Sequence, residues 1–108
     1  MTYLLLALLL DLADISALVW EESGGRPWKV SDKGCCGLMQ VSPRALGTWL
    51  GRRWTCEDLK NPWLGLGAGI TMRQRWQERS ARAGMPECWR AGYRGGNRRF
   101  RECVRNGP

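Results

Sequence analysis

Two short motifs lie close together in the first half of the chain: residues 21–27 read EESGGRP, and residues 37–43 read GLMQVSP. The first motif follows a long apolar stretch, so it places two adjacent carboxylates, Glu21 and Glu22, at the end of an expected helix. Two glycines directly after the carboxylates are typical of the loop in which a helix ends. The sequence therefore predicts a helix, a sharp exit from it, and a loop that leads to a second segment opened by glycine.

The two glutamates are expected on different faces of this helix. Glu22 follows Ile15, Leu18 and Val19 by seven, four and three residues, so it shares their apolar face, whereas Glu21 is turned away by about 100°. A carboxylate on an apolar face loses hydration in its charged form, which raises its pKa and lets it donate a proton near neutral pH. A general acid for glycoside cleavage needs that property. The plainer alternative for Glu22 is a half-exposed helix-terminal residue.

Composition and charge limit the class of protein. The chain has 108 residues, of which 44% are hydrophobic and 25% are charged, and this excludes a disordered or collagen-like chain. The net charge is +7; because residues 1–25 hold four acidic and no basic residues, residues 26–108 carry +11. A charge of this size favours an anionic partner, such as nucleic acid, a membrane surface or an acidic cell-wall polymer.

Histidine is absent, which excludes Ser/His and Cys/His nucleophile sites and removes the commonest metal ligand. The five cysteines include no C-x-x-C pair, so we expect no zinc site, no other metal and no cofactor. The neighbours Cys35 and Cys36 are not expected to bond to each other, whereas Cys56, Cys88 and Cys103 can join distant segments. An odd number of cysteines leaves at least one thiol unpaired, and the sequence leaves the pairing open.

The N-terminal segment has an unbroken apolar run at residues 4–10, as a signal peptide would. No basic residue precedes the run, no small-x-small cleavage site follows it, and Asp11 and Asp14 come directly after. The run is also too short for a bilayer, which takes about 20 apolar residues. Because the apolar pattern continues at helical spacing to Val19, we expect a first buried helix rather than a signal peptide, and no transmembrane anchor.

Further helices are predicted after a loop. Residues 23–37 are rich in Gly, Pro, Ser and Asp, which predicts a loop or a short irregular hairpin. Ser42-Pro43 offers a cap and a first-turn proline for a helix at 44–50. Asn61-Pro62 similarly opens a helix that runs through Gln77.

Glycines 65, 67 and 69 lie inside this last helix and cost roughly 1 kcal/mol each relative to Ala, which indicates close approach of other helices. The last third of the chain ends in a further short helix. No period-two strand, internal repeat or long linker is evident. The predicted class is therefore mainly α, with one domain over residues 1–108.

The motifs taken in order resemble the catalytic domain of the soluble lytic transglycosylases, lysozyme-like enzymes that cut peptidoglycan. They are ESGGRP, a Ser nine residues after Glu22, GLMQVSP, NPWLGLGAGI and AGYRGG. The resemblance covers roughly residues 13–100, and the first two motifs are specific at this spacing. It implies a lysozyme-like single domain, of the goose-type lysozyme and lytic transglycosylase kind, with an irregular loop or short hairpin after the catalytic helix.

Carried over by position, the resemblance makes Glu22 the sole catalytic acid and base. Ser31 would orient the substrate or Glu22, Met39 and Gln40 would line the saccharide groove, and Tyr93 would place its hydroxyl near Glu22. The substrate would be the β-1,4 bond between N-acetylmuramic acid and N-acetylglucosamine, and the product a 1,6-anhydromuramyl end.

Two departures from the family pattern are visible. Arg94 stands where the Ala-Tyr-Asn motif has Asn, and Cys35-Cys36 replaces small residues before GLMQ. Arg94 is expected to change the surroundings of Tyr93. Cys35-Cys36 is expected to alter the groove floor or to respond to oxidation.

The resemblance also implies partners and a place of action. Peptidoglycan glycan strands are the expected partner, in the periplasm or cell wall, and no nucleic acid is expected. Small members of this kind resemble phage virion or lysis enzymes, whose cellular counterparts serve conjugation or secretion machinery. Two alternatives remain: a goose-type lysozyme-like hydrolase of the same bond, and a non-enzymatic basic module whose RGGNRRFR segment contacts phosphates and whose Trp residues stack on bases.

Overall fold

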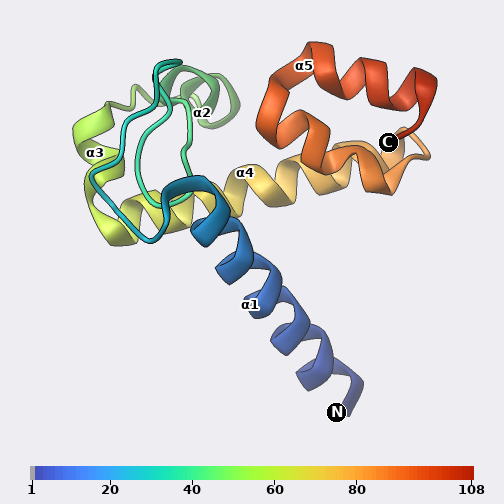
Figure 1. Cartoon of the computed structure of the whole chain (residues 1–108). Coiled ribbons are helices and arrows are strands. Elements are labelled where there is room, and N and C mark those ends of the chain that lie inside the picture. The colour runs from blue at the N-terminus through green and yellow to red at the C-terminus, as the bar shows by residue number, and fades with distance from the viewer. Residues whose placement is uncertain (1) are drawn as a thin grey trace. The chain divides into compact units, whose positions relative to one another are not determined.

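The structure is a computed structural model that describes residues 2–108, and it is mainly helical, as predicted (Figure 1). Within the described residues the only β-structure consists of isolated bridges. The chain divides into two compact units, the first ending at Gly69 and the second spanning Ile70–Pro108. Its helices are α1 (Thr2–Ser23), α2 (Pro43–Leu50), α3 (Cys56–Lys60), α4 (Pro62–Arg82), the 3-10 helix η1 (Pro86–Cys88) and α5 (Trp89–Asn106).

Helix α1 forms as predicted, but the expectation that it is buried is wrong for most of its length. Leu18 is 1% exposed and Ser23 is fully buried. The large apolar side chains from Tyr3 to Leu12 are exposed; they are Tyr3, Leu4, Leu5, Leu6, Leu8, Leu9, Leu10 and Leu12. Consecutive apolar residues point to every side of a helix, so a single packed face cannot bury them.

By length and composition alone, Tyr3–Ser23 qualifies as a helix that could cross a membrane. Its most apolar 18 residues have a mean hydropathy of 1.9, and 6% of them are buried. Signal sequences and buried core helices pass the same test. Residues 4–10 by themselves are too short to span a bilayer, but the helix continues through Asp11 and Asp14 to Ser23. The helix is therefore long enough for a transmembrane anchor, contrary to what the apolar run predicted.

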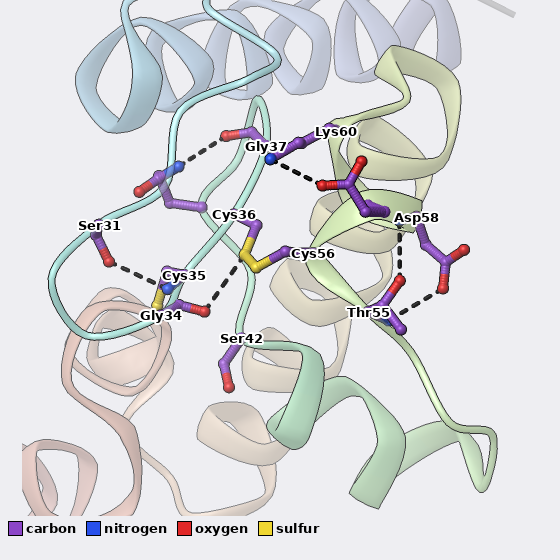
Figure 2. The surroundings of a disulfide bond; sticks show 12 residues. Ser31, Gly34, Cys35, Cys36, Gly37, Ser42, Thr55, Cys56, Asp58 and Lys60 are labelled. Carbon is purple, nitrogen blue, oxygen red and sulfur yellow. Dashed lines mark hydrogen bonds and ion pairs between the residues drawn. A yellow bond between two sulfur atoms is a disulfide. The ribbon is translucent and has the colours of Figure 1, made fainter.

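After α1 the chain forms the irregular hairpin that the sequence predicted. Cys36 makes antiparallel bridges with Val30 and with Val41. A disulfide joins Cys36 to Cys56, with 5.5 Å between their Cα atoms, and so fastens the hairpin to the first residue of α3 (Figure 2). Cys35 is the free cysteine and is half-buried, so the adjacent cysteines do not pair with each other, as expected.

Local capping explains the next two helices. Ser42 caps α2 by accepting a hydrogen bond from the Ala45 amide at 3.3 Å, with Pro43 in the first turn, as the sequence predicted. Helix α3 was not predicted. It is only five residues long, and it depends on a capping box in which Thr55 and Asp58 each accept the other's backbone N–H.

Helix α4 begins at the predicted Asn61-Pro62 step, because the Asn61 Oδ1 accepts hydrogen bonds from the backbone N–H groups of Trp63 and Leu64, at 3.0 and 3.2 Å. The helix runs to Arg82 rather than ending at Gln77. A Cβ on Gly65 would overlap the backbone of Leu59, and a Cβ on Gly69 would overlap the side chain of Met39. The prediction of close approach is therefore right for Gly65 and Gly69.

Gly67 departs from that prediction, since a Cβ there would meet nothing within 4 Å. The neighbours of Gly65 and Gly69 also differ from those expected. They are α3 and the hairpin loop rather than long helices.

The second unit has a small core of its own. The rings of Trp76 and Phe100 lie 5.2 Å apart, and Gly92 leaves room for the Trp76 ring where a Cβ would overlap it. A disulfide joins Cys88, the last residue of η1, to Cys103 in α5. Helix α5 bends sharply at Gly96, whose φ of 71° is outside the helical range, and its two arms are visible in Figure 1.

Candidate active site

The end of α1 is held by Ser23, the residue after the two glutamates. Its hydroxyl donates to the Val19 carbonyl at 3.0 Å and accepts from the Gly25 amide at 3.2 Å, and the side chain is fully buried. Gly24 and Gly25 have φ values of 64° and 78°, a left-handed conformation that favours glycine. The ESGG motif therefore ends the helix at a defined residue and directs the chain into the hairpin.

Glu22 and Glu21 differ in exposure in the direction that the helical periodicity predicted. Glu22 is half-buried on the face of α1 that carries the buried Leu18, whereas Glu21 is exposed. A carboxyl group that is partly shielded from water and lies on a rigid helix end is a suitable proton donor, because its position is fixed before a ligand binds. Of the two carboxylates, Glu22 is therefore the more shielded, although its intermediate exposure also fits the plainer alternative of a half-exposed residue at the helix end.

Lys29 joins the two motifs, a role that no sequence pattern predicted. Its ammonium Nζ donates to the main-chain carbonyl of Glu22 at 2.8 Å. Its own carbonyl accepts from the Gln40 side chain at 2.9 Å and from the Gly37 amide at 2.9 Å. Lys29 therefore couples the position of the Glu22 backbone to that of the GLMQ turn.

Gln40 lies in this turn with a φ of 51°, an uncommon value for a residue other than glycine. Its amide nitrogen Nε2 donates to the carbonyls of Lys29 and Gly37, at 2.9 and 3.0 Å. Because a glutamine amide has two N–H donors, both are used inside the loop, and the Oε1 acceptor is what the side chain can offer to a ligand. Gln40 is half-buried, which is compatible with its expected place beside a saccharide.

Ser31 closes the tip of the hairpin. Its hydroxyl oxygen accepts from the Cys35 amide at 3.1 Å, as Figure 2 shows, and its backbone N–H donates to the Cys35 carbonyl at 2.9 Å. The hydroxyl proton can still be donated, so Ser31 can also form a hydrogen bond to a substrate. Its role in shaping the loop was not predicted.

The expectation that Met39 lines a saccharide groove is wrong. Its side chain is 0% exposed and packs where a Cβ on Gly69 would lie. The turn between Gly37, with a φ of 84°, and Gln40 directs Met39 inward and leaves Gln40 nearer to the surface. Of the two residues expected to line the groove, only Gln40 is partly exposed.

Tyr93 lies on α5 in the second unit, whereas Glu22 belongs to the first. Its ring meets Trp89 edge-on, with 6.4 Å between ring centroids, and Arg94 beside it is exposed. The expected proximity of the Tyr93 hydroxyl to Glu22 therefore stays a prediction. Within residues 2–108, no three His, Cys, Asp or Glu side chains are grouped so that they could hold a metal ion.

The family model described as the Transglycosylase SLT domain matches residues 9–107. No curated protein and no solved structure matches the chain. The matched range contains every residue of the candidate site, from Glu22 to Tyr93.

Proposed function

Because the chain belongs to the Transglycosylase SLT domain family, we propose that it is a peptidoglycan lytic transglycosylase with Glu22 as its only acid–base residue. The family membership indicates lytic transglycosylase-type action on peptidoglycan, in the periplasm or cell wall. The observation that carries the finer proposal is the hydrogen-bonded junction of Glu22, Lys29 and Gln40, which holds one partly shielded glutamate at the end of a rigid helix.

The proposed reaction uses one carboxyl group twice. Glu22 in its acid form protonates the oxygen that bridges N-acetylmuramic acid and N-acetylglucosamine, and the C–O bond at the anomeric carbon breaks. The resulting Glu22 carboxylate then removes the proton from the muramyl 6-hydroxyl, whose oxygen bonds to the anomeric carbon. The products are a free N-acetylglucosamine 4-hydroxyl and a 1,6-anhydromuramyl end, and Glu22 is again protonated.

Other residues of the site are proposed to position the sugar. Gln40 offers its Oε1 as an acceptor for a sugar hydroxyl or acetamido N–H, and Ser31 offers its hydroxyl proton. Tyr93 would bring its hydroxyl to Glu22 or to the bridging oxygen. Positioning of this kind supplies a large share of rate enhancement when one reacting group lies within the substrate itself, as the 6-hydroxyl does.

A goose-type lysozyme-like hydrolase is the nearest alternative, since it would use the same glutamate and deliver water to the anomeric carbon. It would need a second group to hold that water. A base-stacking module is less well supported in the arginine-rich second unit, because Trp76 is 5% exposed and Trp89 contacts Tyr93, Arg73 and Arg90. The strongly exposed tryptophans, Trp20, Trp28 and Trp63, all lie in the first unit. Association with virion or secretion machinery remains a proposal that rests on the resemblance alone.

Mass spectrometry of digested sacculi separates these functions. A lytic transglycosylase releases anhydro-muropeptides, which are lighter by one water than the reducing-end products of a hydrolase. A binding module releases neither. We expect anhydro-muropeptides from the parent protein; reducing-end products alone would replace the proposal with the hydrolase.

A further inference from the structure

The positive charge of the protein is concentrated in its second unit. Residues 70–108 hold ten Arg, no Lys and three Glu, a net charge of +7, whereas residues 1–69 hold seven basic and seven acidic residues. We propose that the exposed face of α5 binds the phosphodiester backbone of an anionic cell-wall polymer. This inference rests on the proposed function, because it places the surface in the compartment where the substrate lies.

Three of the ten arginines stabilise the unit itself. Arg73 is 6% exposed and lies over the Trp89 ring at 5.3 Å, with Arg90 over the same ring at 4.6 Å. Arg79 donates to the Asn97 Oδ1 at 2.6 Å and lies 4.7 Å from the centroid of Phe100. The core of the unit thus accounts for these three, and most of the remaining arginines are left at the surface.

A row of arginines follows one side of the second arm of α5. Arg98, Arg101 and Arg105 are all exposed and are separated by three and four residues, so they share one helical face. At about 1.5 Å of rise per residue, their Cα atoms are spaced about 4.5 and 6 Å along the axis. This outer face presents a line of three guanidinium groups.

The opposite side of the same arm is fixed to the core. Phe100 is 4% exposed and packs on Trp76, and Cys103 is bonded to Cys88. Because Phe100 and Cys103 lie about 180° around the helix from the mean direction of the arginines, these contacts hold the outer face toward solvent. The surface is therefore preorganised rather than carried on a mobile tail.

Competition from carboxylates on this face is small. Arg98 approaches Glu102 at 3.7 Å, and both side chains are largely exposed, so the pair contributes little. In the part of the chain that the structure describes, no ion pair holds Arg101 or Arg105. A polyanion can therefore bind these guanidinium groups without first breaking a strong internal contact.

The residue type points to phosphate. A guanidinium group binds a phosphate through two parallel hydrogen bonds, whereas an ammonium group acts as a point charge. Nucleic acid is also a phosphodiester, but binding of single strands uses aromatic rings that stack on bases. In this unit Trp76 is buried and Trp89 is half-buried against arginines, so a polyol-phosphate chain without bases fits the surface better than a single strand does.

The test measures binding of the full chain to poly(glycerol phosphate) by calorimetry, at about 50 and 200 mM salt. One variant replaces Arg98, Arg101 and Arg105 by Gln. A matched control replaces the exposed Lys33, Arg44 and Arg53 of the first unit by Gln and so removes the same charge. We expect the α5 triple variant to lose about ten-fold or more in affinity. The slope of its log affinity against log salt concentration should become shallower by about two to three. The affinity of the control should change by less than about two-fold.

A second triple variant, with Lys at the same three α5 positions, keeps the charge and is expected to lose part of the affinity. Equal loss in the α5 variant and the control would overturn the proposal, as would equal affinity for polyglutamate. Tighter binding to duplex or single-stranded DNA than to poly(glycerol phosphate) would also overturn it.

The two proposals fail separately. Glu22→Gln should bind the polymer like the parent, and the α5 triple variant should still cleave sacculi from which phosphate polymers have been removed. If the parent releases no muropeptides, the proposed enzyme function is lost while the binding result stands by itself. Thermal melts confirm that each variant is folded.

Discussion

The Lys29 ammonium donates a hydrogen bond to the main-chain carbonyl of Glu22 at 2.8 Å, seven residues earlier in the chain. The contact links the start of the hairpin to the end of α1 at the proposed catalytic residue. A hydrogen bond from a charged donor resists displacement more than a neutral one does. The position of Glu22 therefore depends on a residue outside every motif that identifies the family.

Lys29→Met should lower sacculus solubilisation by about ten-fold or more, because a small displacement of an acid–base group reduces its efficiency. It should lower the free energy of unfolding by only about 1 kcal/mol, since the site is half exposed. Lys33→Met, on the exposed side of the same loop, is the matched control. Turnover that falls equally in both variants would show that loop charge, and not the tether to Glu22, is responsible.

Gln40→Glu should open the GLMQ turn. The substitution keeps the shape of the side chain but places a carboxylate oxygen against the carbonyls of Lys29 and Gly37, where two N–H groups now donate. We expect a loss of about 1–3 kcal/mol in unfolding free energy, together with reduced activity. Gln74→Glu on the exposed surface of α4 makes the same chemical change without that cost. Indistinguishable melting curves for the two variants would contradict the assigned role of Gln40.

Gly69→Ala and Gly67→Ala should have opposite effects on stability. A methyl group at Gly69 would overlap Met39, which overpacks the core and costs about 1–3 kcal/mol. At Gly67 nothing lies within 4 Å of the added carbon, so alanine should stabilise the helix by up to about 1 kcal/mol. Urea unfolding of both variants measures the difference. Equal stability would mean that Met39 does not pack against α4 as described.

Tyr93→Phe should lower turnover while the protein stays folded, because the ring contact with Trp89 is kept and only the hydroxyl is removed. Tyr3→Phe, on the exposed start of α1, removes a hydroxyl where no effect is expected. Steady-state rates on purified glycan strands provide the comparison. Unchanged turnover in Tyr93→Phe would remove this residue from the proposed site.

Much of the fold follows from local rules that are visible in the sequence. Ser42-Pro43 and Asn61-Pro62 open α2 and α4 where predicted, because capping depends on adjacent residues. The end of α4 was placed five residues early, since its last turns hold charged residues that favour a helix but give no apolar period. Helix α3 was missed because five residues are too few for any period to appear.

The candidate site was predictable only in part, for a different reason. The face that carries Glu22 follows from helical periodicity, and its exposure relative to Glu21 agrees. Lys29 was missed because a side chain that binds a main-chain carbonyl leaves no pattern in the sequence. Met39 was misplaced because the direction of a side chain in a turn depends on backbone angles at Gly37 and Gln40, which the motif does not reveal.

The burial of α1 shows the limit of hydropathy as a guide. A run of leucines indicates that a segment is buried away from water, but it does not identify the surface that buries it. The structure buries Leu18 and leaves the leucines before it exposed. The inference from an apolar helix to a core helix therefore held only for its last turns.

The central claim is that Glu22 alone transfers the proton at the scissile bond, and paired glutamine variants test it most directly. Release of anhydro-muropeptides from sacculi is measured for Glu22→Gln and Glu21→Gln, with thermal melts as the folding control. Glu22→Gln should lower the rate by about 10² to 10⁴, the usual loss when a general acid–base group is removed, and should stay folded. Glu21→Gln, whose side chain is exposed, should retain the parent rate. A folded Glu22→Gln protein that still releases anhydro-muropeptides at the parent rate would contradict the account.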